Sequence, residues 1–158
     1  MADTFQIEFR DGEFTAGPGA NLLQAMRDEM RQLYAGLDMD GDDMPRAGAT
    51  ELGPPSGALV VGWVSDDPVC VGGVKRLDDR TCEIKRMYVA PAWRGRGVAR
   101  RLLHALEDAA RRIGYGVARL DTGPKQLSAR GLYVSEGYVE IENFNANPVA
   151  SFWGEKPL

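Results

Sequence analysis

Residues 89–103 read Val-Ala-Pro-Ala-Trp-Arg-Gly-Arg-Gly-Val-Ala-Arg-Arg-Leu-Leu, and this stretch decides the fold. Pro91 ends the preceding alternating run, because proline cannot donate to a ladder of backbone hydrogen bonds. Gly95 and Gly97 permit a tight turn, since glycine adopts backbone conformations that other residues avoid. From Val98 onward the apolar residues fall on one stripe with helical spacing. The stretch therefore predicts a strand, a glycine-rich turn and a long amphipathic helix in succession.

The predicted turn has the chemistry of a phosphate-binding site. The first N–H groups of a helix have no partner inside the helix, and the helix dipole favours negative charge there. Gly95 and Gly97 carry no side chain, so a phosphate could approach the backbone closely. Arg94 and Arg96 add cationic donors. These features together indicate a site for a diphosphate group.

Two better-known glycine-rich signatures fit the turn less well. The Walker pattern requires Lys followed by Ser or Thr, and neither pair follows this turn. The dinucleotide fingerprint requires a third small residue three positions after Gly97, where Arg100 stands. A plain helix start, with glycines that serve packing alone, stays open as an alternative at this point.

Apolar alternation and helical spacing predict the remaining elements. A helix lies between the third and fourth predicted strands of the central region, so those two strands should be parallel neighbours. We therefore expect one α/β domain over residues 1–158 with a mixed sheet. The predicted strands cover residues 4–10, 58–64, 69–75, 81–89, 117–121, 138–142 and 150–156, and the helices cover 21–37, 98–113 and 126–136, with a loop and room for a short helix in 38–55.

Composition narrows the functional classes. The chain of 158 residues has a net charge of −4, which argues against nucleic acid as a partner because phosphate binding normally shows as a basic face. It has one histidine and two cysteines without a CxxC pair, so we expect no metal. No apolar stretch approaches the roughly 20 residues that cross a bilayer. We expect no membrane partner, no signal peptide and a cytoplasmic location.

Two motifs resemble those of the GNAT superfamily of N-acetyltransferases. Arg94, Gly97 and Ala99 fill the pattern [RQ]-x-x-G-x-[GA], and residues 132–138 (Leu-Tyr-Val-Ser-Glu-Gly-Tyr) resemble the downstream L-Y-x-x-x-G-[FY]. The predicted order of elements is also similar to that of the family, so the resemblance covers nearly the whole chain. It implies a mostly antiparallel central sheet with a parallel, splayed strand pair and flanking helices.

The resemblance implies acetyl-CoA as a cosubstrate. In such enzymes the pantetheine arm pairs with the strand before the turn, here at Met87, Tyr88 and Val89. The Met87 N–H would then face the thioester oxygen and stabilise the oxyanion formed there, which is worth about 3 kcal/mol for one donor. Gln126 stands where many members place an asparagine that touches the pantetheine. The backbone N–H groups implied to bind the pyrophosphate are those of Arg94, Gly95, Arg96, Gly97, Val98 and Ala99.

Two side chains are implied as catalysts. Only about one lysine-like amine in 10³ is neutral at pH 7, so a base assists the reaction. Glu83 is similar in position to the glutamate of histone-acetylating members, although it could instead be a solvated carboxylate or an ion-pair partner of Lys85 or Arg86. Tyr133 matches the tyrosine that protonates the leaving thiolate in many members. Its alternative role is that of a packing ring under the cofactor.

We therefore predict an acetyl-CoA-dependent N-acetyltransferase that acts on a primary amine of a small molecule or peptide by direct attack in a ternary complex. One rival hypothesis is a non-catalytic acyl-CoA-binding or sensor module, which would not use Glu83 or Tyr133. A second is nucleotide binding at the same turn. The acidic residues of the segment 38–43 could attract a cationic acceptor. The final strands could pair across a homodimer, as they do in some members.

Overall fold

A computed structural model describes residues 4–158 and contains a seven-stranded sheet in the order β1-β2-β3-β4-β5-β7-β6. Every neighbouring pair is antiparallel except β4 and β5, which are parallel. The strands are β1 (Glu8–Asp11), β2 (Ala58–Val64), β3 (Asp67–Arg76), β4 (Thr81–Val89), β5 (Val117–Thr122), β6 (Val139–Glu140) and β7 (Phe152–Pro157). The helices are α1 (Gly17–Leu33), α2 (Val98–Ile113) and α3 (Leu127–Ser135), with a short 3-10 turn at Pro91–Trp93.

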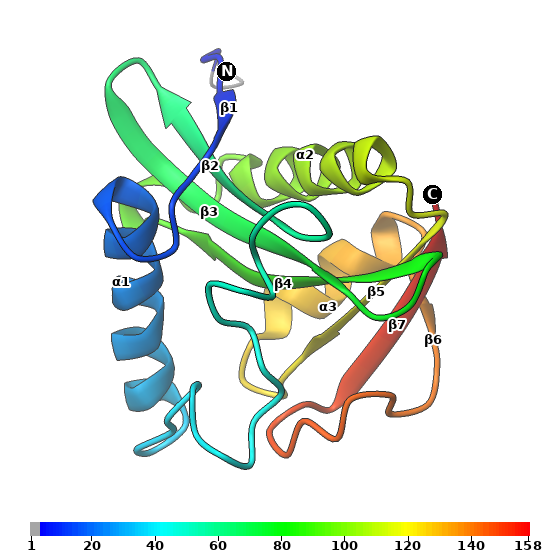
Figure 1. Cartoon of the computed structure of the whole chain (residues 1–158). Coiled ribbons are helices and arrows are strands. Elements are labelled where there is room, and N and C mark those ends of the chain that lie inside the picture. The colour runs from blue at the N-terminus through cyan, green and yellow to red at the C-terminus, as the bar shows by residue number, and fades with distance from the viewer. Residues whose placement is uncertain (1–3) are drawn as a thin grey trace.

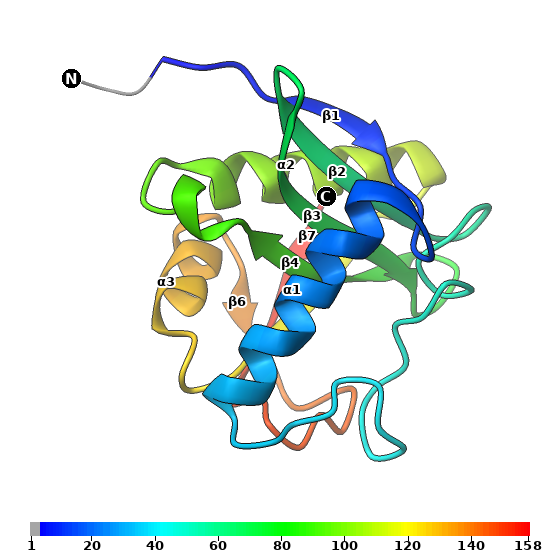
Figure 2. The same ribbon diagram turned by 90° about the vertical axis from the view of Figure 1, so that its left-hand side faces the viewer.

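Helices cover both faces of the sheet (Figures 1 and 2). In Figure 2, α1 crosses in front of the strands, and α2 runs behind them. Each face has its own apolar core: Leu23 and Met26 of α1 pack with Val61 and Val71, whereas α2 and α3 pack on the opposite face. The two cores meet across strands whose central residues are buried on both sides, as in β3.

The predicted fold class is confirmed. The meander of β2, β3 and β4 is antiparallel, and the helix α2 connects β4 to its parallel neighbour β5, as the sequence predicts. The helix predicted over residues 98–113 has the same bounds in the structure. Gly114 follows it in a positive-φ conformation and donates its N–H to the Ala110 carbonyl, which is the expected glycine stop.

The prediction for the first helix is wrong in its bounds. The helix begins at Gly17 rather than at residue 21, because Pro18 occupies the first turn, where its missing N–H costs nothing. It ends at Leu33, since Ala35 and Gly36 both have positive φ angles, so Leu37 lies outside the helix. Residues 38–55 contain turns and no helix. The penultimate strand is shorter than predicted, with only two residues.

A bulge in β4 shapes the region before the glycine-rich turn. Val71 of β3 pairs with Tyr88, but Gly73 pairs with Lys85, so two residues of β4, Arg86 and Met87, stand opposite one residue of β3. Arg86 takes a left-handed conformation with φ of 59°. On its other side β4 pairs with β5 only over residues 81–83. Beyond the bulge the two parallel strands therefore separate, as bulges bend strands and increase their twist.

Packing between α2 and β3 gives a test of the fold. Leu106 is fully buried, and a Cβ added at Gly72 would lie 2.6 Å from its Cδ1, which shows how closely the helix approaches the strand. We expect Leu106→Ala to lower the free energy of unfolding by about 2–5 kcal/mol. Leu127→Ala, at a side chain that is 82% exposed, should change it by less than about 0.5 kcal/mol. Urea denaturation of both variants checks the difference, and equal effects would contradict this packing.

Candidate functional site

A groove of about 720 Å³ opens where β4 separates from β5. Its walls are α1, the end of β4, the glycine-rich turn and α3. Nine of the ten residues predicted to bind the cofactor line it; they are Met87, Tyr88, Val89, Arg94, Gly95, Gly97, Val98, Ala99 and Gln126. The groove therefore brings together the strand, the turn and the downstream helix that the two sequence motifs singled out.

The turn at the end of the groove is open to a ligand. Gly95 and Gly97 have φ angles of 75° and 79°, which L side chains rarely adopt. A Cβ built at either residue would meet no atom within 4 Å, so these glycines are required by conformation rather than by crowding from the protein. Gly97 caps α2 and has no side chain to accept from the first N–H groups of the helix. Those donors are available to an anion in the groove.

The two arginines of the turn point in different directions. Arg94 lines the groove, where its Nε donates to the Val89 carbonyl at 2.9 Å and its guanidinium pairs with Glu29 of α1 at 2.7 Å. Arg96 does not line the groove; its guanidinium lies over the rings of Trp93 and Phe5, at 4.3 and 4.8 Å from the centroids. Arg94 therefore fixes the turn against α1 and the strand end, while Arg96 packs against aromatic residues.

A second, smaller cavity of about 80 Å³ adjoins the groove. It is lined by α1, the loop after it, the β4 bulge, the end of β5 and the segment before β7. Five side chains line both spaces: Met26, Met30, Met87, Gln126 and Tyr133. The junction formed by these five residues is the place where a molecule in the groove and one in the cavity would meet.

Tyr133, for which the resemblance implies proton donation to the leaving thiolate, lies at this junction. Its hydroxyl donates to the Met87 sulfur at 3.7 Å, a weak hydrogen bond. Burial, and then the negative charge of Asp121, raise the pKa of Tyr133 above its usual value near 10. The phenol therefore keeps its proton throughout the neutral pH range.

Glu83 is fully buried and lines neither space. Its Oε2 accepts a hydrogen bond from Asn145 at 2.8 Å and lies 3.2 Å from the ammonium of Lys85. Its Oε1 has no hydrogen-bond partner among residues 4–158. Burial raises the pKa of Glu83, with a further increase from the charge of Asp121, while Lys85 and Asn145 oppose the shift.

Asp121, which the sequence analysis does not identify, lines the smaller cavity. Its Oδ2 accepts hydrogen bonds from the side-chain amides of Asn145 at 2.7 Å and Asn147 at 2.9 Å. The side-chain amide of Asn145 thus donates to both Glu83 and Asp121, and its side-chain oxygen accepts from the Trp153 Nε1 at 3.0 Å. The signal available in the sequence was the asparagine-rich segment at residues 143–147, whose amides suit the fixing of a carboxylate.

One carboxylate of the acidic loop after α1, that of Asp40, is paired within the protein. Asp40 pairs with Arg27 at 2.8 Å and with the buried Arg86 at 3.1 Å, so its charge is already neutralised by the protein. Arg86 also donates to the Met39 carbonyl at 3.2 Å. Four apolar residues of this loop line the smaller cavity: Leu37, Met39, Met44 and Pro45.

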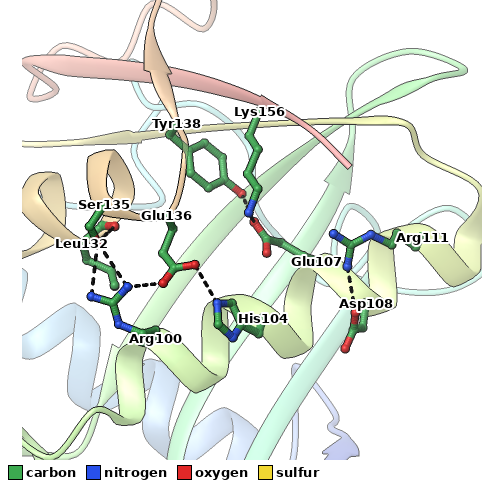
Figure 3. A network of polar contacts seen from close by, with 10 residues as sticks. All are labelled: Arg100, His104, Glu107, Asp108, Arg111, Leu132, Ser135, Glu136, Tyr138 and Lys156. Carbon is green, nitrogen blue, oxygen red and sulfur yellow. Dashed lines mark hydrogen bonds and ion pairs between the residues drawn. The ribbon is translucent and has the colours of Figure 1, made fainter.

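Polar contacts attach α3 to α2 beside the groove (Figure 3). Glu136, just after α3, contacts Arg100 and His104 of α2, and the His104 Nε2 lies 2.7 Å from its Oε2. Tyr138 donates its hydroxyl to the buried Glu107 at 2.8 Å, and Lys156 donates to the same oxygen at 2.9 Å. The two tyrosines of the second motif therefore have different contacts. Tyr133 lines the junction, whereas Tyr138 connects the segment after α3 to Glu107 of α2.

Comparisons with known proteins identify the family. The model of the Acetyltransferase (GNAT) family matches residues 22–138, so the chain belongs to the GNAT acetyltransferases. It is similar to the IAA acetyltransferase of Azospirillum brasilense, with 39% identity over 79 residues, which are 48% of this chain and 51% of that protein. It is also 32% identical over 131 residues to YjgM of Escherichia coli, an uncharacterised N-acetyltransferase, covering 81% of this chain and 68% of that protein. The chain thus spans about half the length of the first of these relatives and two thirds of the second.

Solved structures share the fold. A GNAT-family acetyltransferase from Staphylococcus aureus superposes with a TM-score of 0.76 over 96% of this chain and 99% of that chain, at 19% identity. A GNAT-family acetyltransferase from Elizabethkingia anophelis with acetyl-CoA bound superposes with a TM-score of 0.66 over 96% and 98%, at 15% identity. At these identities the likeness concerns the fold alone. Separately, no helix within residues 4–158 combines the length and the apolar character that a membrane span requires.

We expect the pH dependence of stability to report on Glu83. The pKa of Glu83 in the folded protein is raised above 4.5, its ordinary value in the unfolded chain. At pH values between the unfolded-state and folded-state pKa, the folded protein therefore binds more protons than the unfolded chain. The free energy of unfolding consequently falls as pH rises through this range. Glu83→Gln removes this titration. Relative to the wild type, the stability of Glu83→Gln should therefore increase as pH rises from the unfolded-state pKa of Glu83 to its folded-state pKa. The total increase should be about 1.4 kcal/mol for each pH unit between those two pKa values.

Urea denaturation of wild type and variant at a series of pH values measures this difference. Glu142→Gln, at an exposed carboxylate, is the matched control for the loss of one carboxyl group. A Glu83→Gln curve with the same pH dependence as that of the Glu142→Gln control would contradict the raised pKa.

Proposed function

We propose that this protein transfers the acetyl group of acetyl-CoA to a primary amine, with both molecules bound at once. The observation that carries the proposal is the junction: a groove with a phosphate-binding turn and a smaller cavity share Met87 and Tyr133. Two connected spaces suit direct transfer between two bound molecules. Buried Cys82 packs in the apolar core and lines neither space, so nothing in this arrangement favours an acetyl-cysteine intermediate.

The residues of the groove fit acetyl-CoA. The N–H groups at the start of α2 and the positive-φ glycines offer an uncrowded cradle for a pyrophosphate. Met87, Tyr88 and Val89 lie in the part of β4 that has no partner in β5, so backbone groups there can pair with the amides of the pantetheine; the Val89 carbonyl already accepts from Arg94. Gln126 lines the groove, but its Oε1 accepts from the Gly123 N–H at 3.2 Å, so its side chain also serves the loop before α3. Acetyl-CoA would supply the acetyl group in activated form, as a thioester.

The protein would move two protons during the transfer. Met87 would donate its N–H to the thioester oxygen while negative charge develops there. Tyr133 would give its proton to the sulfur as the carbon–sulfur bond breaks, and its raised pKa means that the phenol is protonated at the start of the reaction. A base must take the proton that the attacking nitrogen loses, so that the amide product is neutral.

Glu83 is our candidate for this base, acting through water. Its raised pKa makes it a stronger proton acceptor than an ordinary carboxylate, and its Oε1 is free to accept. Direct contact with the acceptor is not supported, since the side chain is fully buried and lines neither space. The neighbouring Asn145 orients the carboxylate and connects it to the wall of the cavity.

Acetyl-CoA binding is the first test. At 100 times Kd a ligand adds about 2.7 kcal/mol to stability, which is a rise in Tm of roughly 5–10 °C for a domain of this size. Gly97→Ala should weaken acetyl-CoA binding at least about ten-fold, because its methyl group would project into the cradle and strain the turn. Calorimetric titration with acetyl-CoA gives the dissociation constants of the wild type and of Gly97→Ala.

Gly36→Ala is the matched control. Gly36 also has a positive φ, of 86°, and no atom within 4 Å of an added Cβ, but it does not line the groove. Gly36→Ala should lower stability as much as Gly97→Ala does, without a change in the Kd for acetyl-CoA. ATP and NAD serve as ligand controls, and stabilisation by either of them in place of acetyl-CoA would overturn the proposal in favour of a nucleotide site.

Tyr133→Phe tests the acid. We expect kcat to fall by about 10²–10⁴-fold with the Kd for acetyl-CoA little changed, since the ring stays and only the proton donor is lost. Tyr138→Phe removes a hydroxyl that contacts Glu107 away from the groove, so it should reduce stability and leave kcat unchanged. Initial rates of CoA release over a broad amine panel provide the comparison. If acetyl-CoA binds but no amine reacts, the non-catalytic acyl-CoA module becomes the better explanation.

A further inference from the structure

We propose that Asp121 binds the amine of the acceptor, and that the acceptor is a compact primary amine with an apolar body and no carboxylate next to the amine. This inference rests on the proposed function, because it concerns the molecule that occupies the smaller cavity. It adds a residue that the motifs do not contain, and it selects among amine classes that the fold leaves open.

Asp121 is held in a fixed position. Two hydrogen bonds from neutral side-chain amides, those of Asn145 and Asn147, reach the same oxygen, Oδ2. Asn145 is fixed in turn, because its side-chain oxygen accepts from the Trp153 Nε1 at 3.0 Å and from the backbone N–H of Asn147 at 3.1 Å. Two converging donors leave Oδ1 without a partner among residues 4–158, so it can accept from a ligand.

The charges that line the cavity make Asp121 the group available to a cation. Three charged residues line it, and two of them are paired within the protein: Lys85 with Glu83 at 3.2 Å and Arg86 with Asp40 at 3.1 Å. No ion pair involving Asp121 occurs within residues 4–158. An ammonium group would supply the missing countercharge together with charge-assisted hydrogen bonds.

A second observation points to a ligand in the same cavity. Thr122, the next residue of β5, also lines the cavity and is only 6% exposed. Its Oγ1 is buried and has no hydrogen-bond partner among the described residues. Because buried hydroxyls nearly always have a partner, a polar group bound in the cavity would complete this site as well.

The rest of the cavity suits an apolar body of limited size. Five methionines together with Leu37, Pro45, Ile84 and Val149 form the apolar half of its lining, and its volume is about 80 Å³. Flexible methionine side chains adapt to irregular apolar shapes. A carboxylate next to the amine would lie close to Asp121 and be repelled, and a second ammonium would be buried against apolar groups at a high desolvation cost. Amino acids and diamines should therefore be poor acceptors.

The test compares 3-methylbutylamine with leucine, which carries the same branched carbon chain and a carboxylate beside the amine. We expect kcat/KM to favour 3-methylbutylamine by about 10-fold or more, since like charges in a buried site repel. Asp121→Asn should raise the KM for this amine by about 10-fold or more, through loss of a charge-assisted contact, with the Kd for acetyl-CoA unchanged. Asp66→Asn, at an exposed turn carboxylate outside the cavity and the groove, is the matched control and should change neither the KM for the amine nor the Kd for acetyl-CoA.

Direct binding of 3-methylbutylamine to the CoA complex separates this inference from the proposed function. Calorimetry should detect Asp121-dependent binding of the amine, and the neutral analogue 3-methylbutanol should bind more weakly to the wild type, a comparison that needs no variant to fold. Preference for leucine, equal binding of amine and alcohol, or an unchanged KM in a folded Asp121→Asn would overturn the inference while leaving acetyl transfer intact. Absence of acetyl transfer together with Asp121-dependent amine binding would overturn the proposed function alone.

Discussion

The bulge in β4 is the constraint on which the rest of the site depends. Because Arg86 and Met87 stand opposite a single residue of β3, the strand turns away from β5 after only three parallel pairs. That separation creates the groove, leaves the backbone of residues 87–89 without a partner in β5 and places the smaller cavity beside it. The cost is a buried arginine in a left-handed conformation, which Asp40 and the Met39 carbonyl stabilise.

Each helix has one task in relation to this opening. α2 presents its N-terminus to the groove and packs against β3 so closely that glycine is required at position 72. α1 closes the opposite face and ends beside the loop that precedes α3, where the Tyr34 hydroxyl donates to Gln126 at 3.3 Å. α3 carries Tyr133 to the junction and is held on α2 by Glu136 and Tyr138. The residues that we propose to react therefore lie on elements that are held by core packing and by side-chain contacts between helices.

Local patterns were sufficient to predict the meander, the parallel pair, α2 and the glycine-rich turn, since each of these is written in neighbouring residues. The bounds of α1 were mispredicted because Pro18 and the positive-φ pair Ala35–Gly36 outweighed the apolar spacing. The placement of Glu83 and Asp121 depends on Asn145 and Asn147, which come from a loop more than 20 residues away along the chain. Such long-range contacts leave no periodic trace in a sequence, so Asp121 was not found and the burial of Glu83 was not foreseen.

The loop between α1 and β2 can change in evolution more freely than the glycine-rich turn can. The donors of the glycine-rich turn belong to the backbone and to helix geometry, which few substitutions can imitate. The apolar wall of the smaller cavity, in contrast, comes in part from side chains on a segment without helix or strand. Substitutions at Leu37, Met39 or Met44 can therefore reshape the cavity while the sheet, α2 and the turn stay the same. Under the proposed function, new acceptor preferences would be reachable by single steps that leave the fold and the glycine-rich turn untouched.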